Sequence, residues 1–281
     1  MIENRRICNL SCQEFIKLCA AASTPDEQKM LDAVSSVDSL TNPQESLALY
    51  RLCSLLPEGS KILEIGSFNG SSAVAMGYAI QGKNISIYCI DPWANYLKQE
   101  DFVLLERSRI ADDNKIINSF MRNTSFLGSQ IKMMRGLSSD FASMVAGQNF
   151  DLIFIDGAHD YDSVKNDILT CLAALKPEGL LAGHDYHSMG HGVRQAVNEM
   201  IGQVHTITIK GTIDETYIWF ARIDHPDYLL ELNRISACYA SGDVTAALIL
   251  AKEALIHYKT EELVELTSLY KATLFMEGRA S

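Results

Sequence analysis

The middle of the chain alternates short apolar runs with segments of helical spacing, and turn residues separate the two. Short apolar runs bounded by polar residues predict buried strands, whereas apolar positions three or four residues apart predict helices. The expected strands are residues 62–65, 85–90, 131–134, 152–155, 180–182, 204–209 and 217–223. The expected helices between them are residues 72–80, 113–121, 162–175 and 192–201.

The last two predicted strands are joined only by residues 210–216. Parallel neighbours need a crossover of about a dozen residues or more, so these two strands are expected to be antiparallel. The pattern therefore predicts an α/β fold: a Rossmann-like, doubly wound, seven-stranded sheet with a terminal antiparallel hairpin. The long connection between residues 91 and 130 is expected to contain an extra helix over 96–106, either as a lid or as a surface elaboration.

An N-terminal helical segment, residues 1–57, precedes the predicted sheet domain of residues 58–224. In this segment Thr41 or Asn42 is expected to cap a helix whose first residue is Pro43. Proline is favoured at the first position of a helix because its missing N–H would have no partner there in any case.

A C-terminal helical segment, residues 225–281, follows the predicted sheet domain. Small and apolar residues recur at helical spacing on both sides of residues 241–243, and a third helix is expected over 261–276. The pattern is typical of one tetratricopeptide-like hairpin, and the alternative is an ordinary helical hairpin. A single repeat does not bury its own apolar face, so we expect this segment to dock on the sheet domain or on another subunit.

Composition narrows the class of protein. The chain has 281 residues, of which 47% are hydrophobic, and a net charge of −11. No apolar stretch reaches the roughly 18 residues of a membrane span, and residues 1–20 do not resemble a signal peptide, so we expect a cytoplasmic protein without a membrane partner. Scattered cysteines favour reduced thiols. The acidic charge disfavours nucleic acid and favours a small neutral or basic substrate.

Polar side chains follow two of the predicted buried strands. Asp156 ends one strand and is followed by His159, and the strand over 180–182 leads into His184 and Asp185. If these strands are neighbours, the four side chains converge at the carboxyl edge of the sheet, where open α/β folds bind their ligands. The pattern predicts a functional site at that edge.

The first predicted strand leads into a glycine turn and a helix, the generic arrangement for a nucleotide-like ligand. Gly66 permits close approach to the backbone and Gly70 permits tight entry into the helix. Phe68 takes the place where a dinucleotide-binding loop needs a central glycine, which disfavours pyrophosphate. The acidic Glu64 favours a ligand with positive charge, such as an amino acid or a sulfonium.

The second predicted strand ends at Asp91, with Trp93 two residues later. An acid at this position can accept hydrogen bonds from ribose hydroxyls. Trp93 is a candidate for packing against an adenine or the substrate. The alternative for the Asp91-Pro92 pair is a turn without a ligand.

Together, Glu64–Gly70, Asp91, the strand ending at Asp156 and the segment 175–179 resemble a class I S-adenosylmethionine-dependent methyltransferase over residues 58–223. The resemblance implies that Glu64 and Gly66 face the methionine moiety, Asp91 the ribose, and Leu137 and Ser138 the adenine edge. The expected cofactor-binding residues are Glu64, Gly66, Ser67, Phe68, Gly70, Ser72, Asp91, Trp93, Leu137, Ser138 and Asp156.

Within that class, Asp156 and His159 together with the aspartate Asp185 resemble the metal-dependent sugar O-methyltransferases of macrolide and aminocoumarin biosynthesis. The resemblance implies a divalent metal, Mg²⁺ or Mn²⁺, held by Asp156, His184 and Asp185. In those relatives an acid occupies the position of His184, so Fe²⁺, Zn²⁺ and a site without metal stay open.

His159 and Asp156 are the expected catalytic residues. His159 is the candidate general base, because imidazole suits proton removal near neutral pH, and the alternative is a helix-capping or buried hydrogen-bonding residue. His187 and His191 are candidates for lining the acceptor pocket or are solvated loop residues, and Asp162 is a candidate cap for the following helix.

The resemblance implies an S-adenosylmethionine-dependent methyltransferase, and we expect it to methylate an oxygen of a small hydroxylated metabolite, a sugar or another natural product. We expect a homo-oligomer. The alternative is a cofactor-binding partner or scaffold protein that transfers no methyl group and works through its C-terminal helices.

Overall fold

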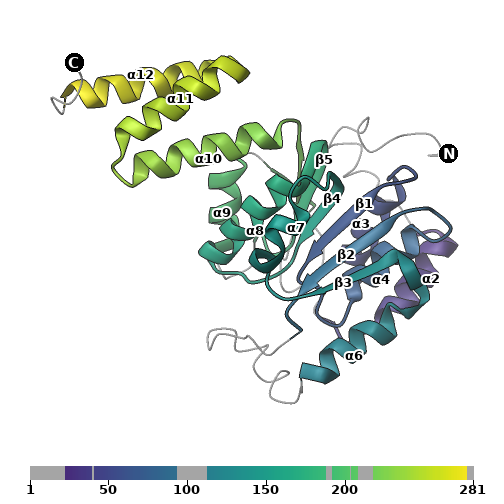
Figure 1. Cartoon of the computed structure of the whole chain (residues 1–281). Helices are drawn as coiled ribbons and strands as arrows, with labels where there is room; N and C mark the ends of the chain where they lie inside the picture. Colours follow the sequence, from purple (N-terminus) through teal and green to yellow (C-terminus); the bar gives the residue numbers. More distant parts are fainter. Residues whose placement is uncertain are drawn as a thin grey trace. The chain divides into compact units, whose positions relative to one another are not determined.

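A computed structural model describes residues 23–39, 41–93, 113–187, 192–202, 204–207 and 218–276. The chain divides into two compact units, residues 1–223 and 224–281 (Figure 1). The first unit therefore combines the expected N-terminal segment with the sheet domain. The predicted helix over 96–106, the N-terminal residues 1–22 and His191 lie outside the described residues.

The first unit is built on one seven-stranded sheet with the order β3-β2-β1-β4-β5-β7-β6. Strands β1 to β5 are parallel, and β7 pairs antiparallel with both β5 and β6. The doubly wound α/β fold with a terminal antiparallel hairpin is thus confirmed. The strands are β1 (Lys61–Ile65), β2 (Ser86–Asp91), β3 (Ile131–Arg135), β4 (Phe150–Ile155), β5 (Leu175–Gly183), β6 (His205–Ile207) and β7 (Ile218–Ile223).

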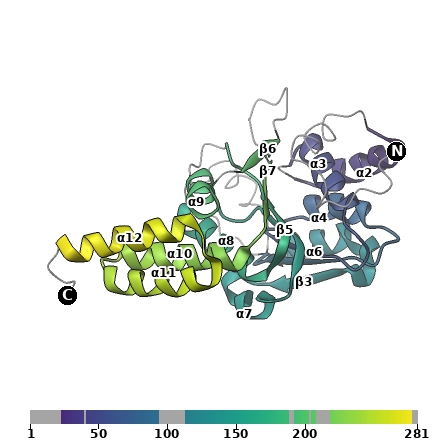
Figure 2. The same ribbon diagram turned by 90° about the horizontal axis from the view of Figure 1, so that it is seen from above.

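Helices cover both faces of this sheet (Figures 1 and 2). Helices α2 to α4 pack with one face of the sheet in a single apolar core, to which Ile62, Leu152 and Phe154 belong. Helix α8 contacts β4 and β5 and packs against α9. The helices of this unit are α2 (Pro25–Ser35), α3 (Pro43–Ser54), α4 (Ser71–Ala79), α6 (Asp113–Asn123), α7 (Ala142–Val145), α8 (Tyr161–Ala174) and α9 (Gly192–Met200), with 3-10 turns η2 (Ser125–Gln130) and η3 (Ser138–Phe141).

Strand β5 begins earlier than its apolar pattern predicts. It starts at Leu175, directly after α8, and its register with β4 shifts between the pairs Phe150–Leu175 and Leu152–Leu180. Glu178 lies in this irregular stretch with a positive φ of 61°. The predicted strand over 180–182 is therefore only the regular end of β5.

The N-terminal helices α2 and α3 have complete caps. Asn42 is the N-cap of α3, as one of the two predicted caps, and Pro43 is its first residue. The side chain of Glu45 returns the capping interaction by accepting the backbone N–H of Asn42 at 2.9 Å. A buried ion pair, Arg51 Nε to Glu27 Oε1 at 2.7 Å, ties α3 to α2.

The second unit consists of three helices that lie side by side (Figure 2): α10 (Pro226–Ala240), α11 (Val244–Tyr258) and α12 (Glu261–Met276). The turn between α10 and α11 contains Gly242 at a φ of 85°, and Asp243 caps α11. Ala247, Leu248 and Leu250 lie in the core of this unit. Docking of the unit on the sheet domain or on another subunit stays a prediction.

Candidate active site

The site lies where the parallel strands β1, β2, β4 and β5 end at one edge of the sheet. The loop after β1 is in direct contact with the loop after β4: the N–H of Asp156 donates to the carbonyl of Ile65 at 2.7 Å. The N–H of His184, after β5, donates to the carbonyl of Ile155 at 3.0 Å. Backbone hydrogen bonds therefore hold the predicted cofactor loop and the acidic cluster together.

Glycines give the loop after β1 its shape. Gly66 has a φ of 85°, and its N–H donates to Ile90 at 2.9 Å. Gly70 has a φ of 91° and is the N-cap of α4. Phe68 also has a positive φ, 45°, and its side chain is 37% exposed, so it stands at the surface of the loop.

Asp91, the last residue of the neighbouring strand β2, accepts hydrogen bonds from this loop. Its Oδ2 accepts the backbone N–H groups of Ser67 and Phe68, both at 2.8 Å, and its Oδ1 accepts that of Trp93. Burial raises the pKa of Asp91, although these three N–H groups act to lower it. A carboxylate has about four acceptor positions, so three are used by the backbone and about one is left for a ribose hydroxyl.

Glu64 lies beneath the loop after β1 and is hydrogen-bonded to it. The side chain is fully buried, and its two oxygens accept the hydroxyls of Ser67 and Ser72. Burial raises the pKa of Glu64 to about 7. The side chain is thus engaged by its own loop, and the expectation that Glu64 faces the methionine moiety stays a prediction.

Trp93 is likewise a core residue. It is 1% exposed, its ring lies 4.8 Å from that of Phe120, and its Nε1 donates to the carbonyl of Phe68 at 3.0 Å. The expectation that it packs against an adenine or the substrate stays a prediction. A positive φ of 41° after Pro92 turns the indole inward, which residue type alone does not indicate.

The residues predicted at the adenine edge separate into two roles. Leu137 is 49% exposed and presents an apolar surface beside η3. Ser138 is buried, and its hydroxyl donates to Asp167 of α8. Burial raises the pKa of Asp167 to about 6. Asp167 was not predicted, because an acid within an amphipathic helix usually faces solvent.

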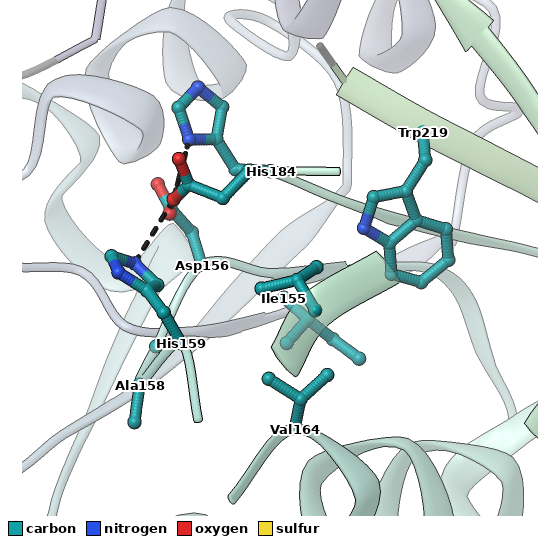
Figure 3. A pocket seen from close by; sticks show the side chains of 10 residues that line it. Ile155, Asp156, Ala158, His159, Val164, His184 and Trp219 are labelled. Atoms are coloured by element: carbon teal, nitrogen blue, oxygen red, sulfur yellow. Dashed lines mark ion pairs between the residues drawn. The ribbon is translucent and has the colours of Figure 1, made fainter. Parts of the chain in front are cut away.

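The predicted metal ligands do come together. Asp156, His184 and Asp185 each offer one ligand atom, and the three atoms lie within 4.8 Å of one another. Nδ1 of His184 lies 3.1 Å from Asp185 Oδ2 and 3.6 Å from Asp156 Oδ1. His159 joins the cluster through its Nε2, 3.0 Å from Asp185 Oδ2. Figure 3 shows Asp156, His159 and His184 grouped on one side of the pocket.

The charges of this cluster are strongly interdependent. Burial raises the pKa of Asp156 to about 6, against the attraction of His184. Burial also disfavours the charged form of His184, but the carboxylates around it outweigh burial and hold its pKa well above the usual range. For Asp185, hydrogen bonds from His159 and His184 outweigh burial and hold its pKa well below the usual range.

A third acid, Glu45, reaches the cluster from α3. It is 0% exposed, and its Oε1 lies 2.9 Å from Nε2 of His184, although the ring N–H does not point straight at that oxygen. The capping pattern indicated a helix start at Pro43, but no sequence signal placed this helix at the active site. Glu45 is the functional candidate that sequence reasoning missed.

The residues after His159 have structural roles. Asp160, and not Asp162, is the N-cap of α8 and accepts the N–H of Ser163 at 3.1 Å.

His187 is exposed, with its ring 4.9 Å from that of Tyr186, so a place in the acceptor pocket stays a prediction.

A small cavity of about 10 Å³ adjoins the acidic cluster, enough for about one water molecule. Val164, Val193 and Trp219 are among its apolar lining residues. Figure 3 shows Val164 and Trp219. Trp219 Nε1 is buried without a hydrogen-bond partner in the described part of the chain. The indole covers Gly183, where an added Cβ would come within 2.6 Å of the ring.

The donor set fits a divalent cation. Two carboxylates and one imidazole converge from the loops after β4 and β5. Mg²⁺ prefers ligand shells of oxygen alone, whereas an imidazole suits Mn²⁺, Fe²⁺ or Zn²⁺ as well. Asp156, Asp185 and His184 could therefore hold such an ion.

Comparison with known proteins agrees with this architecture. Residues 63–186 match a family model described as a methyltransferase domain. Cofactor-bound Rv0187 from MTB superposes with a TM-score of 0.53 at 15% identity, over 76% of this chain and 96% of that one. The O-methyltransferase TomG from Streptomyces achromogenes, involved in tomaymycin synthesis and solved with S-adenosylmethionine, superposes with a TM-score of 0.50 at 16% identity, over 75% and 96%.

No curated protein matches the chain in sequence. At such low identities the two solved structures show the shared fold. None of the helices in the described residues is both long and apolar enough to cross a membrane. The strand order, the glycine turn after β1 and the match over residues 63–186 together identify this part of the chain as a methyltransferase domain.

Proposed function

We propose that this enzyme transfers the methyl group of S-adenosylmethionine to a hydroxyl oxygen of a small metabolite. The observation that carries the proposal is the His159–Asp185 contact of 3.0 Å, within a cluster that Asp156 ties to the cofactor loop. A histidine held by a carboxylate is a common arrangement for a general base, because the carboxylate orients the ring and stabilises its protonated form.

In the proposed reaction, Asp185 holds His159 through Nε2, and the acceptor's hydroxyl proton moves to Nδ1 of the same ring. The oxygen attacks the methyl carbon as the carbon–sulfur bond breaks. The electron pair of that bond stays on sulfur, which leaves the neutral thioether S-adenosylhomocysteine. Alignment of the two reacting groups supplies a large part of the rate increase in such a reaction.

Asp156, His184 and Asp185 are the proposed metal ligands. When bound, a divalent cation would lower the pKa of a coordinated hydroxyl and so ease its deprotonation. Burial already raises the pKa of Asp156 to about 6, so this carboxylate gains from a positive partner. The cluster thus favours a cation near the acceptor oxygen.

For the acceptor, we propose a small hydroxylated compound, a sugar or another natural product. The net charge of −11 favours a neutral or basic molecule. We propose that the enzyme works as a homo-oligomer in the cytoplasm.

The test is a methyl-transfer assay with a panel of small hydroxylated acceptors and S-adenosylmethionine labelled in its methyl group. We expect label in the acceptor and one S-adenosylhomocysteine per product. Exhaustive chelation should abolish turnover and leave cofactor binding nearly intact, and added Mn²⁺ or Mg²⁺ should restore it. Full activity after chelation would reject the metal, and label on nitrogen or carbon would reject oxygen as the acceptor.

A further inference from the structure

Glu45 makes two different contacts with its two carboxylate oxygens. Oε2 accepts the backbone N–H of Asn42 at 2.9 Å and completes the cap of α3. Oε1 lies 2.9 Å from Nε2 of His184. The side chain is 0% exposed, and α3 precedes the residues that the methyltransferase model matches. The cap of α3 requires only the contact with Asn42, so the contact with His184 points to a second role for Glu45.

The two nitrogens of His184 face different surroundings. Nε2 faces Glu45, whereas Nδ1 faces Asp185 at 3.1 Å and Asp156 at 3.6 Å. Carboxylates thus face both nitrogens, and without a cation Nδ1 donates to Asp185. When a cation takes the place of the proton on Nδ1, the one remaining proton is on Nε2, where the carboxylate of Glu45 can accept it.

We propose that Glu45 is a positioning residue that fixes the tautomer of His184, so that Nδ1 is presented to a divalent cation beside Asp156 and Asp185. A metal-bound histidine commonly donates its other N–H to a carboxylate, which fixes the ring orientation and raises the basicity of the ligand nitrogen. This proposal rests on the metal site of the proposed function. It adds that α3 completes this site, and that an imidazole ligand favours Mn²⁺ or Zn²⁺ over Mg²⁺.

The substitution Glu45→Gln tests the contact with His184 separately from the cap of α3. Gln has one acceptor oxygen and one donor NH₂ group, so it cannot accept from both Asn42 and His184. If its oxygen keeps the cap, its NH₂ group faces Nε2, which favours the tautomer with the proton on Nδ1. That proton occupies the nitrogen that the cation needs. Glu45→Gln should therefore weaken metal binding without a change in side-chain size.

The first measurement is calorimetric titration of the metal-free full chain with Zn²⁺ and with Mn²⁺. Loss of a partner of this kind typically weakens metal affinity about 10- to 100-fold, which is the change expected for Glu45→Gln. Asn42→Ala is the matched control, because it removes the cap of the same helix and leaves Glu45 beside His184. The metal affinity of Asn42→Ala should stay within about threefold of the wild type, although loss of the cap lowers its thermal stability.

The second measurement needs no variant. Protein labelled with ¹⁵N in histidine and loaded with Zn²⁺, a diamagnetic probe, should show His184 with a proton on Nε2 and the metal on Nδ1. Metal on Nε2, or an unchanged Zn²⁺ affinity in Glu45→Gln, would overturn the role of Glu45 and leave the metal site standing. A wild-type chain that binds neither ion would overturn the metal site itself, and this inference with it.

Discussion

Gly66 packs directly against the backbone of Asp156. A Cβ atom built on Gly66 would lie 2.0 Å from the carbonyl oxygen of Asp156, and the φ of Gly66 is 85°. The cofactor loop and the acidic cluster are thus in van der Waals contact through a position where only glycine fits. This contact places the methyl donor's loop beside the proposed metal and base.

Gly66→Ala should therefore destabilise the fold and impair cofactor binding together. The new methyl group adds overpacking, about 1–3 kcal/mol, to the cost of a left-handed backbone, about 1–2 kcal/mol. Gly59→Ala is the control, since Gly59 has a φ of 82° but no atom within 4 Å of its built Cβ. Chemical denaturation should show only the backbone cost for Gly59→Ala, and equal effects would show that the contact with Asp156 is unimportant.

Asp91→Ala should weaken S-adenosylhomocysteine binding by about 1.5–3 kcal/mol, the range for a hydrogen bond to a charged group. The structure adds a second cause, because Asp91 also holds the N–H groups of Ser67 and Phe68. Calorimetric titration measures the change. Asp243→Ala is the control, because it removes an aspartate that accepts a backbone N–H in the second unit, from Ala246. Unchanged affinity in Asp91→Ala, or NAD binding by the wild type, would contradict the assignment.

His159→Ala should lower the methyl-transfer rate by about 10²–10⁴, the usual contribution of a positioned base. Cofactor affinity should stay nearly unchanged, because His159 contacts Asp185, which follows β5. Added imidazole should restore part of the rate, which loss of folding would not allow. A fully active variant would show that another group is the base, and Asp185 or His187 would be tested next.

The strand ends of this fold could be predicted because parallel neighbours bring them to one edge. Asp156 and Asp185 follow β4 and β5, which are adjacent, so their convergence follows from strand order alone. The same reasoning placed Asp91 beside the glycine turn. Sequence reasoning works well here because each of these residues is positioned by a regular element.

Three features needed the tertiary structure. Glu45 enters the site because α3 packs over the carboxyl edge, a placement that no local pattern encodes. Trp93 is buried because the chain turns at a positive φ and α6 supplies Phe120. Glu64 faces the interior because Ser67 and Ser72 fold back over it. For Glu45 and Trp93 the side chain's direction depends on a partner distant in sequence, whereas for Glu64 it depends on how the loop after β1 folds.

The C-terminal unit is still expected to dock, and its exposed apolar side chains are the candidates for that contact. Ala247, Leu248 and Leu250 are used in its own core, whereas other apolar side chains are exposed, Ile256 at 70% and Phe275 at 76%. We expect Ile256→Glu to increase proteolytic cleavage between residues 223 and 226, measured by limited proteolysis with size-exclusion chromatography. Lys252→Glu, on an exposed position of the same helix, is the control. Rapid removal of this segment from the wild type, with activity and oligomeric state unchanged, would show an independent module.

Glu64 should make stability fall with rising pH. Burial raises its pKa from 4.5 to about 7 in the folded chain, so the folded state binds the proton more tightly than the unfolded state does. The contribution of the protonated Glu64 to the free energy of unfolding is fully present below about pH 4.5 and is lost as the pH rises through about 7. One pKa unit corresponds to about 1.4 kcal/mol, so the total change is on the order of 3 kcal/mol.

Glu64→Gln removes this titration and keeps the shape of the side chain. Its amide can still bond to the hydroxyls of Ser67 and Ser72, because each hydroxyl can donate or accept. The free energy of unfolding, measured by denaturant titration from pH 4.5 to 8.5, should favour the variant progressively as the pH rises. Other acids cancel in the difference between the two proteins, so the slope reports on position 64. A difference that does not change with pH would show that Glu64 stays ionised in the folded protein, held by its two hydroxyl partners against the cost of burial.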